Sequence, residues 1–126
     1  MRYWISFCLI ALYSLVLSVS CGDNEGVPVC IQDIIDGKNN PVPDSPEYIL
    51  RYVYKGKTVY YLFSGCCDKY NYLLDTKCDI LCSPDGGEFG DGDGMCPDFR
   101  DEAQVKDIIW CVDQATCDSL EDQLDY

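Results

Sequence analysis

The sequence predicts a small, disulfide-rich α+β domain, in which a short N-terminal helix packs on a small antiparallel sheet and a long loop of glycine and aspartate follows. Three observations predict it. Ten of 126 residues are cysteine, a density typical of small secreted domains held by disulfides. Two aromatic and β-branched runs flank a Lys-Gly-Lys turn and predict a hairpin. The length allows one domain rather than two.

The composition excludes several classes of function. The chain has no histidine, which excludes histidine-based catalytic triads and His-ligated zinc. With 22 acidic against 9 basic side chains and a net charge of −13, no nucleic-acid partner is expected. Paired carboxylates raise the possibility of a glycosidase, but a mature chain of about a hundred residues offers no evident cleft for one. We therefore expect no catalytic activity.

Residues 1–20 are predicted to be a signal peptide. Met1 and Arg2 give a positive start, and the uncharged run that follows is shorter than the roughly 20 residues that span a bilayer. Two kinds of cleavage before Cys21 fit the small residues Ser18 and Ser20. One is ordinary signal peptidase cleavage. The other is cleavage at a bacterial lipobox, although the leucine stands four residues before the cysteine instead of three.

The number of cysteines favours the second alternative, in which Cys21 is lipidated. Cys8 leaves with the signal peptide, nine cysteines remain, and lipidation of Cys21 leaves an even number for disulfides. Residues 21–27 then form a tether to a membrane of the cell envelope, with the outer membrane expected. The eight cysteines predicted to form disulfides are Cys30, Cys66, Cys67, Cys78, Cys82, Cys96, Cys111 and Cys117.

Four disulfides would each stabilise the domain by about 2–4 kcal/mol, mainly by restricting the unfolded chain. Their pairing does not follow from the sequence, because eight cysteines allow about 105 combinations. Neighbouring Cys66 and Cys67 point to opposite sides of the chain, so we expect each to bond a different partner. A strained disulfide between the two, acting as a redox switch, is the alternative.

The mature chain begins with a predicted helix over Pro28–Gly37. Ile31, Ile34 and Ile35 fall on one face, Pro28 suits the first turn and Gly37 is a natural end. A helix this short needs a packing partner. After a connecting loop over Lys38–Pro46, the hairpin provides one.

The hairpin pairs Tyr48–Tyr54 with Thr58–Phe63. If Lys55 and Gly56 form a two-residue turn, three cross-strand pairs share one face, each contributing about 0.2–1 kcal/mol. These pairs are Tyr52 with Val59, Leu50 with Tyr61, and Tyr48 with Phe63.

The second half of the chain gives weaker signals. A second strand pair is expected over Tyr70–Leu74 and Cys78–Cys82, followed by an irregular, glycine-rich loop over Ser83–Pro97. One helical turn is expected over Asp101–Lys106 and a last strand over Asp107–Val112. We thus predict a domain over residues 28–112 and an acidic C-terminal extension over residues 113–126, frayed from Ser119 onward.

The glycine-rich loop contains the one stretch with candidate ligand chemistry. Carboxylates alternate with glycines there, and Ca²⁺ takes six to eight oxygen ligands that such a chain could wrap around it. The run beginning at Asp91 starts like an EF-hand loop but lacks the later acidic positions. A solvated turn pinned by Cys82 and Cys96 is the simpler alternative. The candidate Ca²⁺ ligands are Asp85, Glu88, Asp91, Asp93 and Asp98.

Several motifs together resemble an uncharacterised lipoprotein family common in Bacteroidota. They are Gly56–Tyr61, Cys66-Cys67-Asp68, Leu81–Gly87, Gly90–Gly94 and Cys96–Phe99. The resemblance covers residues 30–110. It implies a cell-envelope lipoprotein and supplies no catalytic residues. Because Cys111 and Cys117 lie beyond the part that resembles the family, it also implies that these two bond to each other.

The function expected from these observations is a binding or structural module of the cell envelope, with calcium as a candidate cofactor. The protein or glycan partner is not specified by the sequence. The alternative is a secreted protease inhibitor that presents Ser83–Cys96 to an enzyme. The glycine content of that loop argues against inhibition, because an inhibitory loop should be stiff before it binds.

Overall fold

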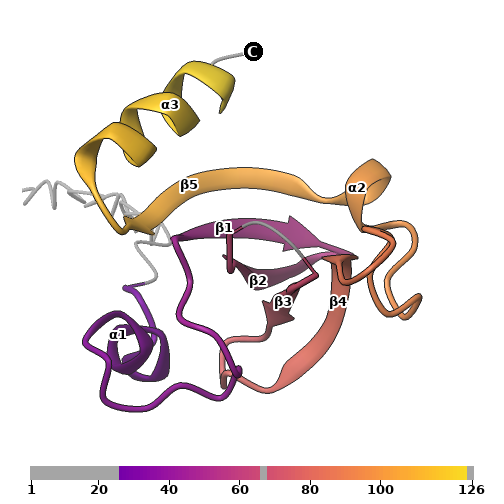
Figure 1. Ribbon diagram of the computed structural model, residues 1–126, viewed down its shortest axis with the longest axis horizontal. Coiled ribbons are helices and arrows are strands. Elements are labelled where there is room, and N and C mark those ends of the chain that lie inside the picture. The colour runs from indigo at the N-terminus through magenta and orange to yellow at the C-terminus, as the bar shows by residue number, and fades with distance from the viewer. Residues whose placement is uncertain (1–25, 66–67, 125–126) are drawn as a thin grey trace, which may run out of the picture.

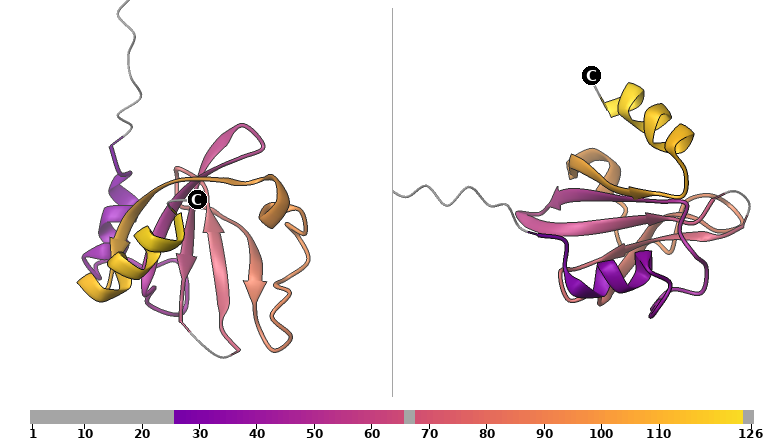
Figure 2. Two further views of the ribbon diagram at one scale, coloured as in Figure 1. Left: turned by 90° about the horizontal axis from the view of Figure 1, so that it is seen from above. Right: turned by 90° about the vertical axis from the view of Figure 1, so that its left-hand side faces the viewer.

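The computed structural model describes residues 26–65 and 68–124. Its centre is a five-stranded antiparallel sheet with strand order β4-β3-β2-β1-β5. The helices lie on both sides of this sheet: α1 is below it and α3 above it in Figure 1, and the turned views agree (Figure 2). The α+β, disulfide-rich fold class is therefore confirmed. Among the described helices, none is long and apolar enough to cross a membrane.

The first helix, α1 (Val29–Ile35), forms as predicted. Pro28 precedes it, and Gly37 at φ +68° ends it. The helix buries Ile31 and Ile34 against one face of the sheet, where Ile49, Tyr60 and Leu62 complete an apolar cluster. A disulfide from Cys30 to Cys78 ties the helix to the turn after β3.

The hairpin of β1 (Tyr48–Tyr54) and β2 (Lys57–Phe63) has the predicted register. Tyr52 pairs with Val59, Leu50 with Tyr61 and Tyr48 with Phe63. Lys55 and Gly56, at φ +50° and +74°, form the two-residue turn. All six paired side chains belong to the second apolar cluster, on the face opposite α1.

The next strand, β3 (Tyr70–Leu74), matches its prediction, but β4 (Ile80–Gly86) does not. It begins two residues later than expected and continues through Ser83-Pro84-Asp85-Gly86, for which the sequence predicts an irregular loop. These residues form a strand because β3 pairs with them on one side, with Asn71 opposite Asp85. On the other side, the chain that follows returns and bonds to them.

The C-terminal third also differs from the prediction. The helical turn α2 (Phe99–Glu102) comes earlier, and β5 (Gln104–Cys111) begins three residues before Asp107. Within the acidic extension, the described residues form a helix, α3 (Gln114–Leu124), where fraying from Ser119 onward was predicted. Asp113 accepts a hydrogen bond from the Thr116 N–H at 2.8 Å, and Leu120 is buried in the cluster opposite α1.

The structure pairs six of the predicted disulfide cysteines. Besides Cys30–Cys78, it forms Cys82–Cys96 and Cys111–Cys117, the last being the pair that the resemblance implies. Cys66 and Cys67 lie outside the described residues, as do Cys21 and the predicted signal peptide.

Candidate binding site

The chain between β4 and α2, residues 87–98, is called the Gly/Asp loop below. It returns along the outer edge of β4. The Gly92 N–H donates to the Gly86 carbonyl at 3.1 Å, and the Asp93 N–H donates to the Ser83 carbonyl at 2.9 Å. The loop therefore closes the edge of the sheet at β4 with main-chain hydrogen bonds.

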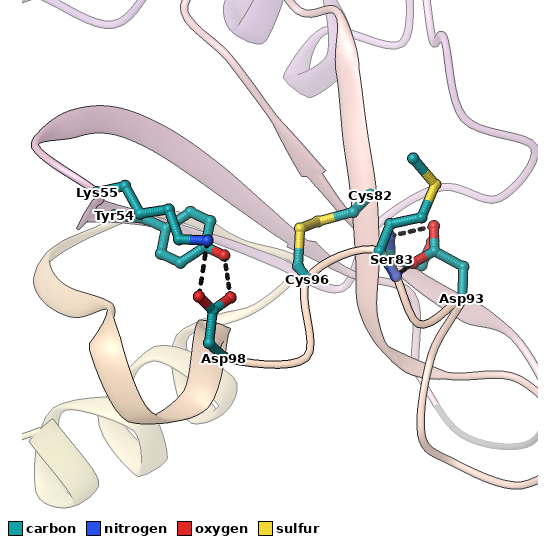
Figure 3. The surroundings of a disulfide bond; sticks show 8 residues. Tyr54, Lys55, Cys82, Ser83, Asp93, Cys96 and Asp98 are labelled. Atoms are coloured by element: carbon teal, nitrogen blue, oxygen red, sulfur yellow. Dashed lines mark hydrogen bonds and ion pairs between the residues drawn. A yellow bond between two sulfur atoms is a disulfide. The ribbon is translucent and has the colours of Figure 1, made fainter.

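The Asp93 carboxylate completes this closure. Its Oδ2 accepts the Ser83 N–H at 2.8 Å, and its Oδ1 accepts the Met95 N–H at 2.9 Å. Figure 3 shows Asp93 beside Ser83, with the Cys82–Cys96 disulfide next to them. Both carboxylate oxygens of Asp93 thus serve backbone donors of the loop and of β4.

Close approach of the two chain segments requires glycine at residue 92. A Cβ atom there would lie 2.1 Å from the Ser83 carbonyl oxygen, and its φ is +72°. The beginning of the loop is also crowded, though by a side chain, since a Cβ on Gly87 would lie 2.7 Å from the Tyr70 ring. The base of the loop is therefore held at both ends, by packing as well as by the disulfide.

Asp85, on β4, is bound by side chains instead. The Tyr61 hydroxyl donates to its two oxygens at 2.9 and 3.0 Å, and the Asn71 amide donates to Oδ1 at 2.7 Å. Burial and the Asp85 carboxylate raise the pKa of Tyr61 far above its ordinary value, so this hydroxyl stays protonated and donates. Arg100 lies 3.6 Å from the same carboxylate.

Asp98, at the far end of the loop, binds the tip of the hairpin. Its Oδ2 lies 2.7 Å from the Lys55 ammonium, and its Oδ1 accepts a hydrogen bond from Tyr54 (Figure 3). The Lys55 ammonium, and then the Tyr54 hydroxyl, hold the pKa of Asp98 below its usual value. This carboxylate therefore joins the loop to the β1–β2 turn.

The five candidate Ca²⁺ ligands are thus not brought together. Asp85, Asp93 and Asp98 bind protein donors at three separate places, while Glu88 and Asp91 are exposed and contact no described donor. Within residues 26–65 and 68–124, no three histidine, cysteine, aspartate or glutamate side chains form a group that could hold a metal ion. The geometry does not supply the calcium site that the spacing suggested.

The tip of the loop presents apolar side chains to solvent. The Gly90 N–H donates to the Gly87 carbonyl at 3.2 Å, which places Glu88 and Phe89 at the centre of a tight turn. Phe89 is 84% exposed and Met95 is 72% exposed. A hydrophobic side chain on a polar loop is the one sequence signal for this site, and it is separate from the pattern of carboxylates and glycines.

An open groove of about 460 Å³ lies beside Phe89. One part of its lining is apolar, from Phe89 and two prolines. The other part carries one charge of each sign. The lining residues are Pro84, Phe89, Gly90, Asp91, Gly94, Pro97 and Arg100. The arrangement can bind a ligand that combines an apolar portion with charge, and it shows no group of acid, base and nucleophile.

Comparison with known proteins places the chain in a family without an assigned activity. It belongs to the family described as "Domain of unknown function (DUF6970)", whose model matches residues 36–122. The match begins directly after α1 and ends inside α3, so the segment after Trp110 belongs to the family rather than lying beyond it. No curated protein and no solved structure matches the chain.

Proposed function

We propose that this protein is an exported, lipid-anchored binding module of the cell envelope, and that the Gly/Asp loop is its recognition element. One observation carries the proposal. The base of the loop is held by main-chain hydrogen bonds, the Asp93 carboxylate and the Cys82–Cys96 disulfide, while its tip leaves Phe89 84% exposed.

A fixed loop with an exposed aromatic side chain suits binding for a physical reason. Association costs free energy whenever loops and side chains must be ordered, and a loop held in place before binding avoids most of that cost. Aromatic side chains then supply a large contact area with few rotatable bonds, and they are common among the residues that dominate interface energies.

The export and the anchor are supported by the sequence and by the disulfides. All six cysteines among the described residues are paired, and disulfides persist in oxidising compartments outside the cytosol. Residues 1–20 have the pattern of a signal peptide, and Cys21 follows small residues. The lipid on Cys21 would attach the domain to a membrane, with the outer membrane expected, through the tether of residues 21–27.

A protease inhibitor is the rival function. The argument against it from the sequence was that a glycine-rich loop is too flexible. The base of the loop is stiff despite its glycines, so flexibility no longer argues against inhibition. The tip, however, is a tight turn from Gly87 to Gly90, whereas a segment that imitates a protease substrate must be extended. Calcium dependence is left out of the proposal because Asp85, Asp93 and Asp98 already bind protein donors.

Site-specific cross-linking in the intact envelope tests the recognition element. A photoreactive phenylalanine analogue replaces Phe89 in the full-length protein, and the matched control places it at Val112, which is 56% exposed. We expect position 89 to give a discrete cross-linked species that position 112 does not give. The same pattern from both positions, or none from position 89, would contradict the proposal. Inhibition of a panel of proteases, lost in Phe89→Ala, would favour the rival.

Intact mass tests the anchor separately. Protein purified from the envelope should have the mass of residues 21–126 plus a diacylglyceryl group, with or without an N-acyl chain. Cys21→Ser should abolish this addition and release the protein from the membrane fraction. An unmodified mass, or one that retains residues 1–20, is incompatible with lipidation.

A further inference from the structure

The groove beside Phe89 is more acidic than its lining alone suggests. Glu88 and Asp91 are exposed and have no partner among the described residues, and Asp91 lines the groove itself. The Gly/Asp loop contains no lysine or arginine. The electrostatic potential over the tip of the loop is therefore negative.

The one base beside the groove does not reverse this potential. The Arg100 guanidinium lies 3.6 Å from Asp85, but its side chain is 70% exposed and lines the groove together with Asp91. Lys55, the next base along this side of the sheet, is paired with Asp98 at 2.7 Å. Around the groove, the two exposed carboxylates of Glu88 and Asp91 outnumber the one exposed base, Arg100, so the net charge that a ligand would meet is negative.

Phe89 adds a second attraction for the same kind of ligand. The face of an aromatic ring carries negative electrostatic potential and attracts ammonium and guanidinium groups. An exposed ring next to an uncompensated carboxylate can accept the aliphatic stem of a lysine or arginine on its face, while the carboxylate accepts the charged end. Pro97, which is exposed, would contact the apolar neighbours of that side chain.

From these contacts and charges we infer that the groove binds a lysine- or arginine-bearing segment of a partner protein, with the cationic side chain between Phe89 and Asp91. This inference rests on the proposed function and specifies the chemistry of its partner. The net charge of −13 also favours a basic partner, because long-range attraction increases the rate of association.

Selection from a random dodecapeptide display library tests the inference, with the purified, oxidised full chain immobilised at physiological salt. We expect enriched peptides to carry lysine or arginine next to apolar residues. Their affinity should fall about tenfold in Phe89→Ala and several-fold in Asp91→Asn. The matched control is Asp122→Asn, on exposed α3, which removes the same charge away from the groove and should change the affinity less than about twofold.

Three results would overturn the inference. One is enrichment of peptides without basic residues. Another is an equal loss of affinity in Asp91→Asn and Asp122→Asn, which would mean attraction by net charge alone. The third is the absence of enriched peptides together with binding of neutral oligosaccharides at the loop. A glycan that binds at Phe89 would refute the basic partner and retain the loop as recognition element, whereas failure of cross-linking from residue 89 would refute the proposed function itself.

Discussion

The two edges of the sheet are protected in different ways. At β4, the chain folds back on itself, and Gly92 and Asp93 bond to the edge strand. At β5, the pairing with β1 shifts register twice, leaving Lys106 and Ile109 as extra residues, and α3 packs alongside. Bulges and covering segments are both known means of preventing edge-to-edge aggregation. The groove beside Phe89 lies at the β4 edge, so the loop that protects this edge also forms the candidate site.

The largest expected effect comes from forcing the loop away from β4. Gly92→Ala places a methyl group 2.1 Å from the Ser83 carbonyl oxygen at a positive φ, so we expect a loss of about 3–4 kcal/mol in unfolding free energy. Gly94→Ala is the matched control, since Gly94 has a similar φ of +75° but open space around it. It should lose only about 1–2 kcal/mol. Urea unfolding measures both, and equal losses would contradict close contact at residue 92.

Removing single disulfides compares the two edges directly. Replacing Cys82 and Cys96 by serine opens a loop with a sequence separation of 14, and replacing Cys111 and Cys117 opens one of 6. Loop entropy predicts losses of about 3 and about 2 kcal/mol respectively. Chemical unfolding of the two double variants should preserve this order. The reverse order would mean that the attachment of α3 contributes more to stability than the closure of β4.

The Asp93 carboxylate is expected to contribute about as much to the free energy of unfolding as one of these disulfides. Asp93→Ala leaves the N–H of buried Ser83 without its acceptor, at a cost of about 1–3 kcal/mol. Asp91→Ala, two residues away and without a described side-chain partner, should change stability by less than about 0.5 kcal/mol. Equal effects of the two substitutions would mean that net charge, and not the hydrogen bond, sets the result.

Alkaline pH should weaken the attachment of β4 through Tyr61. Burial and Asp85 raise the pKa of this tyrosine in the folded state, so its contribution is complete below the unfolded pKa and is lost as the pH rises above about 10. Above that pH, the contribution of Tyr61 to the free energy of unfolding should fall by about 1.4 kcal/mol per pH unit. Unfolding curves at stepped pH should show a shallower decline in Tyr61→Phe, and an unchanged slope would contradict the assignment.

The smallest expected effect is that of calcium. Because Asp93 and Asp98 already bind protein donors, millimolar Ca²⁺ and EDTA at matched ionic strength should give the same melting temperature. A higher melting temperature in calcium that disappears in Asp91→Asn would show that a site assembles when the ion binds. A calcium concentration of ten times the dissociation constant would then raise the free energy of unfolding by about 1.4 kcal/mol.

Elements whose conformation depends on neighbouring residues could be predicted from the sequence. Elements that depend on contacts between distant segments could not. The hairpin register was predicted correctly because Lys55, Gly56 and the alternating aromatics on either side specify it locally. The strand character of Ser83–Gly86 could not be seen, since a proline and a glycine in that run are typical of loops. Its partners, Asn71 and Asp93, come from separate segments.

The candidate site shows the same limit. The carboxylates were identified, but their roles depend on donors that the sequence does not place near them: Tyr61 for Asp85, and Lys55 for Asp98. α3 was missed for a different reason. Its signals, Asp113 as an N-cap and Leu120 with Leu124 four residues later, are present in the sequence. The acidic composition of the segment, which is typical of frayed termini, favoured the opposite prediction.

The Cys30–Cys78 and Cys82–Cys96 disulfides have a mechanical consequence. They lie in series, joined by the short stretch from Cys78 to Cys82. Tension applied between the N-terminal end of the domain and the Gly/Asp loop would therefore travel along covalent bonds through the first residues of α1, the end of the β3–β4 turn and the start of β4. The hairpin of β1 and β2 would lie outside this path. A force applied to the domain at these two points would therefore not be carried by the hydrogen bonds between β1 and β2.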